Sequence, residues 1–543
     1  MLKELRGSDV IIECLLEQGV DTVFGYPGGA VLNIYDSLYK YSDKIHHVIT
    51  AHEQAACHAA DGYSRTTGRT GVVIATSGPG ATNLVTGIAT AYMDSIPMVA
   101  ITGNVTRDLL GLDSFQEVDI CGITMPITKH NYIVKDPAEL ADIIREAFYI
   151  ANEGRKGPVL IDIPMDVQKA VINFEYPEKC EIRSYKPTTK GNYVQVRRVM
   201  AALEEAEKPL ICIGGGVFAA HAENEIRELA DLMQIPVITT MMGISVFPDD
   251  DQLFCGMIGT HGVKMANAAV NECDVLFLVG ARVGDRAVKT PLALEKTTKI
   301  IHIDIDPAEI GKNIGADLPL VGDAKLVLQQ MTELAKPMKH DEWIAHIKTL
   351  GGERKYVEPA KGTVNPRVFI DRLAKKMPAN VTVVADVGQN QIWTCTEYKF
   401  RKEGRLLTSG GMGTMGYSVP AAIGAKMADN SRATVAICGD GAFQMSFMEL
   451  ATAVQFGVDI KVVVMTNNRL GMVRELQTNG YHDRQTAVFL DGSPDFIKLA
   501  EAYGIPAMRV YDDDTMDKGV EMLAEHKGIC LVEVVVDKDM PTL

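Results

Sequence analysis

Short apolar runs rich in β-branched residues alternate along the whole chain with longer, amphipathic stretches. The runs have the length of buried strands, and the longer stretches, such as 140–152 and 447–456, have the period of helices. Strands that alternate with helices predict parallel sheets covered by helices on both faces, so we expect an α/β protein. The runs expected to form strands are 72–75, 98–102, 159–163, 210–213, 275–279, 300–303, 382–385, 434–438 and 461–465.

Two polar stretches that contain Gly and Pro interrupt this alternation, at 185–192 and 351–366. Such stretches are typical of linkers, and they divide the chain into 1–185, 186–350 and 351–543, each the size of an ordinary domain. We therefore expect three doubly wound parallel-sheet domains. Segments 71–92 and 433–454 share the order strand, G-x-G and helix, which permits two similar domains that face one ligand.

Composition and charge narrow the class of protein. Of the 543 residues, 47% are hydrophobic and 23% are charged, the balance of a soluble globular protein. With 54 Lys and Arg against 70 Asp and Glu, the formal charge is −16, which argues against general binding to nucleic acid.

The location of the protein is also indicated by the sequence. No apolar run reaches the roughly 18 residues of a membrane helix, and the charged start MLKELRGSDVIIECLL does not resemble a signal peptide. The ten cysteines include no C-x-x-C pair, so the sequence does not support a zinc knuckle or a thioredoxin-like motif. We expect a soluble cytoplasmic protein, without a membrane partner, whose cysteines are reduced.

The strongest chemical signal is Gly439-Asp440-Gly441, followed 27 residues after the aspartate by Asn467. Asp440 follows one expected strand and Asn467 follows the next, and a right-handed crossover brings two such strand ends close together. A carboxylate and an amide oxygen that meet there suit Mg²⁺, and the glycines let backbone N–H groups approach phosphate oxygens. The alternative is structural, with a tight turn at the glycines and a polar loop at Asn467.

With this signature the chain resembles the thiamine diphosphate-dependent enzymes, in which G-D-G is followed by Asn. The resemblance implies that Asp440, Asn467 and the backbone carbonyl of Arg469 bind Mg²⁺. Asn468 is the neighbouring alternative to Asn467, but the match of residues 471–473 (GMV) favours Asn467.

Glu53 is the second candidate that this resemblance identifies. It stands where an expected strand, 47–51, gives way to an alanine-rich helix, a place where glutamate also complements the helix dipole. In the family, a glutamate at this place hydrogen-bonds N1′ of the coenzyme's aminopyrimidine ring and so starts its chemistry. The resemblance implies that Glu53 has this role, with the pyrimidine-binding domain first and the diphosphate-binding domain third.

Within this family the chain is most similar to the large catalytic subunits of acetolactate synthases. The resemblance implies decarboxylation of pyruvate and transfer of its two-carbon unit to a second 2-keto acid, either pyruvate or 2-ketobutyrate. Pyruvate oxidase, pyruvate decarboxylase or a silent regulatory paralogue are the alternatives, although Glu53, Asp440 and Asn467 are all intact. The segments that carry the resemblance are 23–38, 51–103, 113–119, 127–136, 154–164, 386–393, 409–425 and 470–473.

The same resemblance assigns further residues. Those expected to line thiamine diphosphate are Pro79, Asn83, Val387, Gly388, Gln389, Asn390, Gly413, Met415, Gly441, Ala442 and Met472, with Met415 supporting the bent form of the coenzyme. Gly29, Phe115 and Gln116 would border the reacting centre. Arg286 would hold the carboxylate of the second substrate through its guanidinium fork, the alternative being an ion pair at the surface or between domains.

The middle block has the pattern G-x-G-x-x-A at Gly214, Gly216 and Ala219 after an expected strand, which alone is weak evidence for a dinucleotide. The block resembles the FAD-binding domain of acetolactate synthases, in which FAD has no redox role in the main reaction. The residues that the resemblance assigns to FAD are Arg155, Gly214, Gly215, His261, Gly280, Arg282, Asp304 and Asp323. Related enzymes keep the fold without FAD.

Several departures from the family pattern bear on specificity. Leu476 stands where the family usually has a tryptophan associated with preference for 2-ketobutyrate, so we expect a weaker preference here. Asp108 and Met165 replace a usual arginine and lysine, and the chain ends at Leu543 where many relatives carry a longer tail over the site. The resemblance also implies a homodimer or homotetramer with active sites between subunits, and a regulatory small subunit is a further expected partner.

Overall fold

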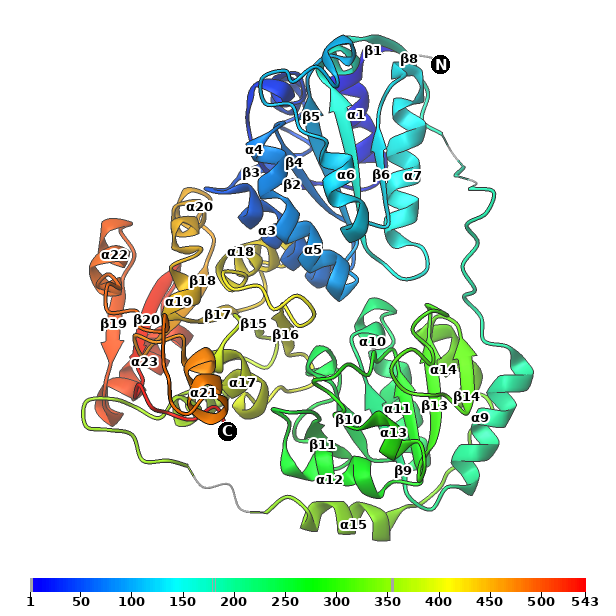
Figure 1. Cartoon of the computed structure of the whole chain (residues 1–543), viewed down its shortest axis with the longest axis vertical. Helices are drawn as coiled ribbons and strands as arrows, with labels where there is room; N and C mark the ends of the chain where they lie inside the picture. The colour runs from blue at the N-terminus through cyan, green and yellow to red at the C-terminus, as the bar shows by residue number, and fades with distance from the viewer. Residues whose placement is uncertain (1–2, 178, 181, 353–355) are drawn as a thin grey trace.

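Three α/β bodies make up the chain in the computed structural model, which describes residues 3–177, 179–180, 182–352 and 356–543 (Figure 1). Each body is built on a six-stranded sheet in which all neighbouring strands are parallel. This confirms the expected fold class. The stretch 185–192 and the described part of 351–365 contain no helix or strand, and 353–355 of the second expected linker lie outside the described residues.

The N-terminal domain carries its sheet in the order β3-β2-β4-β5-β7-β6 and a small antiparallel pair of β1 with β8. The strands are β1 (Lys3–Arg6), β2 (Thr22–Tyr26), β3 (His46–Ile49), β4 (Gly71–Ala75), β5 (Met98–Asn104), β6 (His130–Ile133), β7 (Pro158–Pro164) and β8 (Val171–Phe174). The helices are α1 (Gly7–Glu17), α2 (Leu32–Lys40), α3 (Glu53–Thr67), α4 (Pro79–Asn83), α5 (Val85–Asp94), α6 (Ile120–Thr124), α7 (Leu140–Asn152) and α8 (Met165–Lys169).

The middle domain has a different strand order, β11-β10-β9-β12-β13-β14, which is the order 3-2-1-4-5-6 of dinucleotide-binding sheets. Its strands are β9 (Pro209–Ile213), β10 (Val237–Thr239), β11 (Phe254–Met257), β12 (Val275–Val279), β13 (Lys299–Asp304) and β14 (Leu318–Val321). Its helices are α9 (Tyr193–Glu205), α10 (Gly216–Ala219), α11 (Glu223–Met233), α12 (Lys264–Glu272), α13 (Pro291–Leu294), α14 (Ala324–Thr332) and α15 (Asp341–Thr349).

The C-terminal domain repeats the strand order of the N-terminal one, because β16-β15-β17-β18-β20-β19 and β3-β2-β4-β5-β7-β6 both read 2-1-3-4-6-5. Its strands are β15 (Thr382–Ala385), β16 (Arg405–Thr408), β17 (Thr434–Gly439), β18 (Ile460–Thr466), β19 (Ala507–Val510) and β20 (Cys530–Val535). Its helices are α16 (Pro366–Lys376), α17 (Gln389–Glu397), α18 (Ser418–Ala428), α19 (Asp440–Phe443), α20 (Leu450–Gln455), α21 (Gly471–Gly480), α22 (Phe496–Ala502) and α23 (Asp513–Glu525).

The expected strands are all present, with ends that differ by at most two residues, because fully buried β-branched runs have no other stable place in such a sheet. The expected helix 447–456 is shorter, since residues 447–449 form a 3₁₀ turn before α20. The single helix expected after Asp440 is also broken between α19 and that turn. The break lets the Glu449 carboxylate accept backbone N–H groups of Ala51 and His52 at 3.0–3.1 Å, which joins the two outer domains.

The N- and C-terminal domains pack closely along α3 and α18 (Figure 1). Glycine makes this possible, since a Cβ on Gly424 would lie 1.8 Å from the Ala59 carbonyl oxygen and one on Gly62 would lie 2.0 Å from that of Ala421. The two helix backbones are therefore in direct contact. Because Gly62 and Gly424 have no side chain, the two domains can pack at this short distance.

The Gly424→Ala substitution should lower the free energy of unfolding by about 3 kcal/mol, because overpacking here can be relieved only by moving a helix. Thermal unfolding followed by circular dichroism measures the effect. Gly480→Ala is the matched control, since no atom lies within 4 Å of its added Cβ, and it should unfold like the parent protein. Equal melting temperatures for all three proteins would contradict this account of the α3–α18 contact.

Among the described residues, no helix is long and apolar enough to cross a membrane. All ten cysteines are free thiols.

Candidate functional site

Asp440 and Asn467 follow neighbouring parallel strands at the carboxyl edge of the C-terminal sheet. β17 pairs with β18 so that Gly439 lies opposite Met465, and the next residues along each strand bring Asp440 against Asn467. The Asp440 carboxylate accepts the backbone N–H of Gly441 at 2.8 Å, of Asn467 at 3.1 Å and of Asn468 at 2.6 Å. The crossover geometry predicted from the sequence spacing is therefore present.

The electrostatics of Asp440 fit a bound cation. The residue is only 2% exposed, and burial raises the pKa of its carboxyl to about 6 although backbone N–H groups oppose the shift. Among the described residues, no Lys, Arg or His side chain forms an ion pair with it. A buried carboxylate without a cationic partner is costly unless a positive charge is supplied, which a divalent ion would do.

The remaining oxygen donors are an amide and a carbonyl rather than acids. The described residues contain no group of three His, Cys, Asp or Glu side chains that could hold a metal, so this centre depends on one carboxylate. The side-chain oxygen of Asn467 accepts the backbone N–H of Arg469 at 3.0 Å, and its amide group donates to Gln389 at 3.3 Å. Hard oxygen donors of this kind match Mg²⁺, which retains positions for phosphate oxygens.

The residues expected to line the diphosphate lie at the switch point of the sheet, between β15 and β17. Gly388 has φ 147° at the start of α17, a conformation that favours glycine. Asn390 in that helix donates to the backbone carbonyls of Asp386 and Ile437 at 2.8 and 3.2 Å, so it also ties α17 to β17. Ligands of open α/β sheets bind at such switch points, next to Val387, Gln389, Gly441 and Ala442.

Residues 409–417, called here the coenzyme segment, contain Gly413 and Met415. Gly413 has φ 69° and Gly416 has φ 86°, so the segment turns sharply at both glycines. The Met415 methyl group would lie 3.5 Å from a Cβ on Gly441, which puts this side chain beside the G-D-G turn. Met472 is in the first turn of α21, directly after the loop of Asn467.

Glu53 lies at the corresponding edge of the N-terminal sheet, as the first residue of α3. Its carboxylate accepts the side-chain amide of Asn83 at 2.9 Å and lies 3.3 Å from the Cβ position of Gly80. Gln116, with φ 60°, packs against Gly78, one residue before Pro79. The structure thus brings Glu53, Pro79, Asn83 and Gln116 to one place, although 63 residues separate the first from the last.

Three other expected residues of the reacting centre face open space. A Cβ on Gly29 would meet no atom within 4 Å, and Phe115 is 88% exposed. The Arg286 side chain is 78% exposed and pairs with its neighbour Asp285, at 3.6 Å.

Three of the candidate FAD residues, Gly214, Gly215 and Gly280, lie at the switch point of the middle sheet, between β9 and β12. A Cβ on Gly214 would lie 2.2 Å from the Gly280 carbonyl oxygen, and Gly280 has φ 55°. Gly215 follows in the same turn, facing Met242. Two glycine loops that touch in this way leave the strand ends open to a ligand, as in dinucleotide-binding folds.

The acids of this candidate site end the next two strands. Burial raises the pKa of Asp304 at the end of β13 to about 6, and Asp323 caps α14 just after β14.

The two candidate arginines link the middle domain to the N-terminal one. Arg155 of the N-terminal domain donates to Ser95 at 2.9 Å and to Glu309 at 2.7 Å. Arg282 of the middle domain donates to the Met93 carbonyl at 2.5 Å. Burial lowers the pKa of His261, the remaining candidate of this site. Thus both arginines hold the middle domain against the N-terminal one.

Sequence reasoning missed several residues that shape the site. Asp386 is fully buried and accepts the N–H groups of Val387, Gly416 and Ser418 at 2.8–3.0 Å, which fixes the coenzyme segment. Its position directly after an expected strand could have identified it. Glu475 and Thr542 form a further cluster around Gln389, and no local pattern marked them because their contacts join distant parts of the chain.

Comparison with known proteins agrees with this geometry. Residues 5–123, 196–331 and 386–534 match the N-terminal TPP binding, central and C-terminal TPP binding domains of thiamine pyrophosphate enzymes. The chain is 44% identical to the probable acetolactate synthase large subunit of Methanocaldococcus jannaschii, over 98% of this chain and 92% of that protein. It is 44% identical to the acetolactate synthase of Arthrospira platensis (99% and 95% covered) and 45% identical to the large subunit of Corynebacterium glutamicum (94% and 83%).

Proposed function

Because this chain belongs to the thiamine pyrophosphate enzymes and, among them, to the acetolactate synthases, we propose that it converts pyruvate and a second 2-keto acid into a 2-acetohydroxy acid with loss of CO₂. With pyruvate as second substrate the product is 2-acetolactate, and with 2-ketobutyrate it is 2-aceto-2-hydroxybutyrate. The observation that carries the proposal is the pair of polar clusters at matching edges of two identically ordered sheets, Glu53 with Asn83 and Asp440 with Asn467.

Some residues of the chain would bind the metal ion and the coenzyme, and Glu53 would transfer a proton. Asp440, Asn467 and the Arg469 carbonyl would hold Mg²⁺ and, through it, the diphosphate. Glu53 would hold a proton at N1′ of the pyrimidine ring, and Asn83 orients its carboxylate. When bound, thiamine diphosphate would supply the nucleophilic carbon and the electron sink that decarboxylation of a 2-keto acid needs.

Substrate recognition is assigned to Phe115, Gln116 and Arg286, of which Phe115 and Arg286 are exposed in the single chain. Phe115 and Gln116 would exclude water from the reacting centre, and Arg286 would bind the carboxylate of the second keto acid. A guanidinium that is 78% exposed and weakly paired is free to bind a carboxylate.

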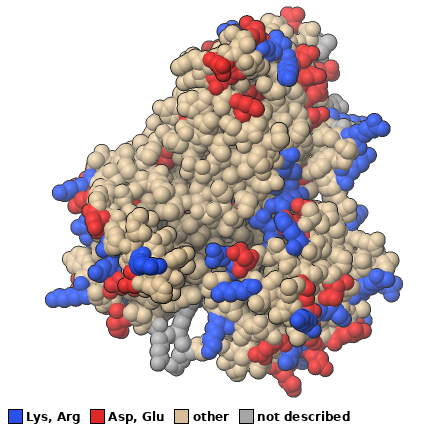
Figure 2. Space-filling view, viewed as in Figure 1, with Lys and Arg blue, Asp and Glu red and all other residues tan. Residues whose placement is uncertain are grey.

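We also propose that the active site is completed by a second copy of the chain, in a homodimer or homotetramer. Charged side chains are sparse on the face where the N- and C-terminal domains adjoin (Figure 2). Large apolar side chains are exposed on both domains, among them Leu112, Phe115, Met445 and Phe489. Exposed apolar surface of this kind favours association. Several relatives are named large subunits, which supports the proposal that a smaller regulatory subunit is a further partner.

The middle domain is proposed to hold FAD without redox use. Its 3-2-1-4-5-6 order, the contact of Gly214 with Gly280, and the acids Asp304 and Asp323 at the next strand ends all fit a dinucleotide. The cytoplasm is the proposed location, which the ten free thiols support because that compartment keeps thiols reduced.

Product analysis tests the proposed function. Purified protein is supplied with thiamine diphosphate, Mg²⁺ and pyruvate, and acetolactate is measured as acetoin after acid treatment. Acetoin formation that requires both the coenzyme and the metal supports the proposal. Acetaldehyde or hydrogen peroxide as main product would assign the chain to a decarboxylase or an oxidase, and unchanged pyruvate would indicate a silent paralogue.

The choice of second substrate should depend on Leu476. This side chain lies on α21 four residues after Met472 and is 59% exposed, so it leaves space on that side of the site. Leu476→Trp should raise the ratio of acetohydroxybutyrate to acetolactate about tenfold, the size of effect expected when a pocket gains contact with one methylene group. Products are quantified with both keto acids at equal concentration.

Leu476→Met is the control, because it nearly conserves volume and should leave the ratio unchanged. A parent protein that already forms mainly acetohydroxybutyrate would contradict the role given to Leu476.

A further inference from the structure

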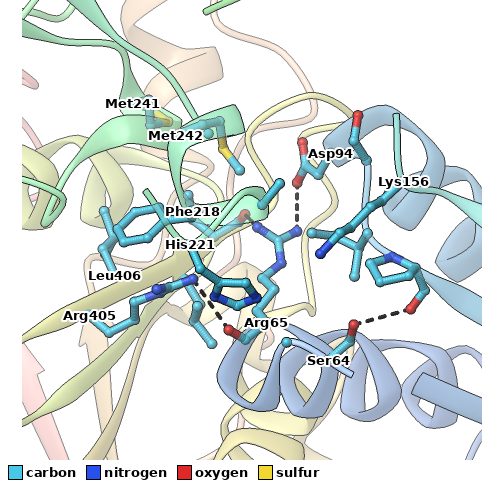
Figure 3. A pocket seen from close by; sticks show the side chains of 18 residues that line it. Ser64, Arg65, Asp94, Lys156, Phe218, His221, Met241, Met242, Arg405 and Leu406 are labelled. Atoms are coloured by element: carbon cyan, nitrogen blue, oxygen red, sulfur yellow. Dashed lines mark hydrogen bonds and ion pairs between the residues drawn. The ribbon is translucent and has the colours of Figure 1, made fainter. Parts of the chain in front are cut away.

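A buried ion triad joins the N-terminal domain to the coenzyme segment, residues 409–417. Arg65 donates to the Asp61 carboxylate at 2.6 and 3.3 Å and to the Asp94 carboxylate at 2.8 Å. The Arg65 side chain is 6% exposed, and the two acids are not exposed at all. Figure 3 shows the Arg65 guanidinium directed at Asp94, at a pocket where all three domains meet.

Each acid of the triad also binds the C-terminal domain. Asp94 accepts the backbone N–H of Gly410 at 3.2 Å and that of Gly411 at 2.7 Å. Asp61 accepts the hydroxyl of Tyr417 at 2.5 Å. The triad therefore holds both ends of the coenzyme segment.

Two further contacts hold the middle of the segment and the residue just before it. The hydroxyl groups of Thr90 and Thr414 are hydrogen-bonded at 2.7 Å, and Arg65 donates to the Thr408 carbonyl at 3.2 Å, just before the segment. From the opposite side, Asp386 accepts the N–H of Gly416 at 3.0 Å. Met415 is left between these anchors, next to Gly441.

The charges of the triad depend on hydrogen-bond donors of the coenzyme segment. Two carboxylates share one guanidinium, so the group carries an excess negative charge that is balanced by N–H and O–H donors of the segment. Burial opposes the charge on Arg65, but the neighbouring acids raise its pKa well above the ordinary value. The ion pair therefore stays charged, and the segment must stay in place to satisfy it.

We propose that Asp94, Arg65 and Asp61 are positioning residues, which fix the coenzyme segment so that Gly413 and Met415 are pre-formed to receive thiamine diphosphate. This inference rests on the proposed function, because the ligand of the segment is the coenzyme assigned there. A pre-formed segment binds the coenzyme without an ordering cost at the moment of binding. Releasing the segment should weaken coenzyme binding while leaving the substrate side of the site unaffected.

The test is coenzyme binding by Asp94→Asn, measured by isothermal titration calorimetry with thiamine diphosphate and excess Mg²⁺. The variant keeps the shape of the side chain but removes its charge, and its Kd should rise roughly tenfold, as for the loss of one charge-assisted hydrogen bond. At saturating coenzyme, the KM for pyruvate should equal that of the parent. Tyr417→Phe, a milder change that keeps the ion triad, should shift the Kd in the same direction by about threefold.

Asp249→Asn is the matched control. Asp249 is a partly buried aspartate between two domains, and it accepts the Phe400 N–H at 2.8 Å and pairs with Lys399 at 3.4 Å, away from the coenzyme segment. Its variant should lose thermal stability but bind coenzyme like the parent.

The outcomes separate this inference from the proposed function. Parent-like Kd values for Asp94→Asn and Tyr417→Phe, or an equal shift in Asp249→Asn, would overturn the positioning role alone. A parent protein that binds no thiamine diphosphate would refute the proposed function and this inference together. If Asp94→Asn does not fold, the Kd of Tyr417→Phe decides.

Discussion

Glu53→Gln should lower the rate of acetolactate formation by a factor of about 100 or more, the contribution typical of a general acid–base group. The amide keeps the size of the side chain and can still bond Asn83, but it cannot exchange a proton with the pyrimidine ring. Coenzyme binding measured by calorimetry should stay within about threefold of the parent, since one hydrogen bond changes little. The combination of normal binding with a large loss in kcat is the expected signature.

Glu449→Gln provides the control for this substitution. Glu449 is a buried carboxylate close to the start of α3, where it accepts the N–H groups of Ala51 and His52, but nothing places it against coenzyme or substrate. Its variant should keep kcat within a small factor. Parent-like activity in Glu53→Gln would remove this glutamate from the mechanism.

Asp440→Asn should raise the Mg²⁺ concentration needed for half-maximal activity by at least about tenfold, because the candidate centre has a single negatively charged ligand. The asparagine oxygen can still accept backbone N–H groups, so the fold is retained better than with alanine, which would leave three buried donors unpaired. Titration of activity with Mg²⁺ at saturating coenzyme measures the shift.

Asp459→Asn is the comparison at the opposite end of the same strand, β18. Asp459 pairs with Lys461 and lies away from the carboxyl edge of the sheet. Its variant should show the Mg²⁺ dependence of the parent. An unchanged Mg²⁺ requirement in Asp440→Asn would contradict the metal assignment.

Much of the fold could be predicted because its strands are fully buried. A run such as 275–279 has no polar face, and it forms β12 with the expected ends. Spacing also predicted that Asp440 and Asn467 would meet, since a strand, a crossover and a parallel strand leave little freedom. These inferences rest on local pattern and on general rules of handedness.

Contacts between distant segments could not be predicted in the same way. Asp94 and Gly411 are 317 residues apart, and neither lies in a pattern that requires the other. The middle sheet has a different strand order from the two other six-stranded sheets. That order depends on how whole strand–helix units pack together, and no single apolar run in the sequence determines it. The close α3–α18 contact depends on Gly62 and Gly424, which in the sequence are only two small residues within helices.

The roles given to the site residues come from resemblance and stay predictions, but the structure limits them. Glu53 and Asp440 lie in different domains, and each has its own polar partners, Asn83 for one and backbone N–H groups for the other. We propose that Glu53 of one copy of the chain and Asp440 of a second copy serve one coenzyme.

Complementation between two inactive variants tests this central claim most directly. Glu53→Gln and Asp440→Asn proteins are mixed under conditions that allow subunits to exchange, or are co-expressed, and acetolactate formation is measured at low Mg²⁺. If each site takes Glu53 from one subunit and Asp440 from the other, a mixed dimer has one intact site. Random mixing should then restore about one quarter of the parent activity. Activity that stays at the level of the separate variants would contradict a site shared between subunits.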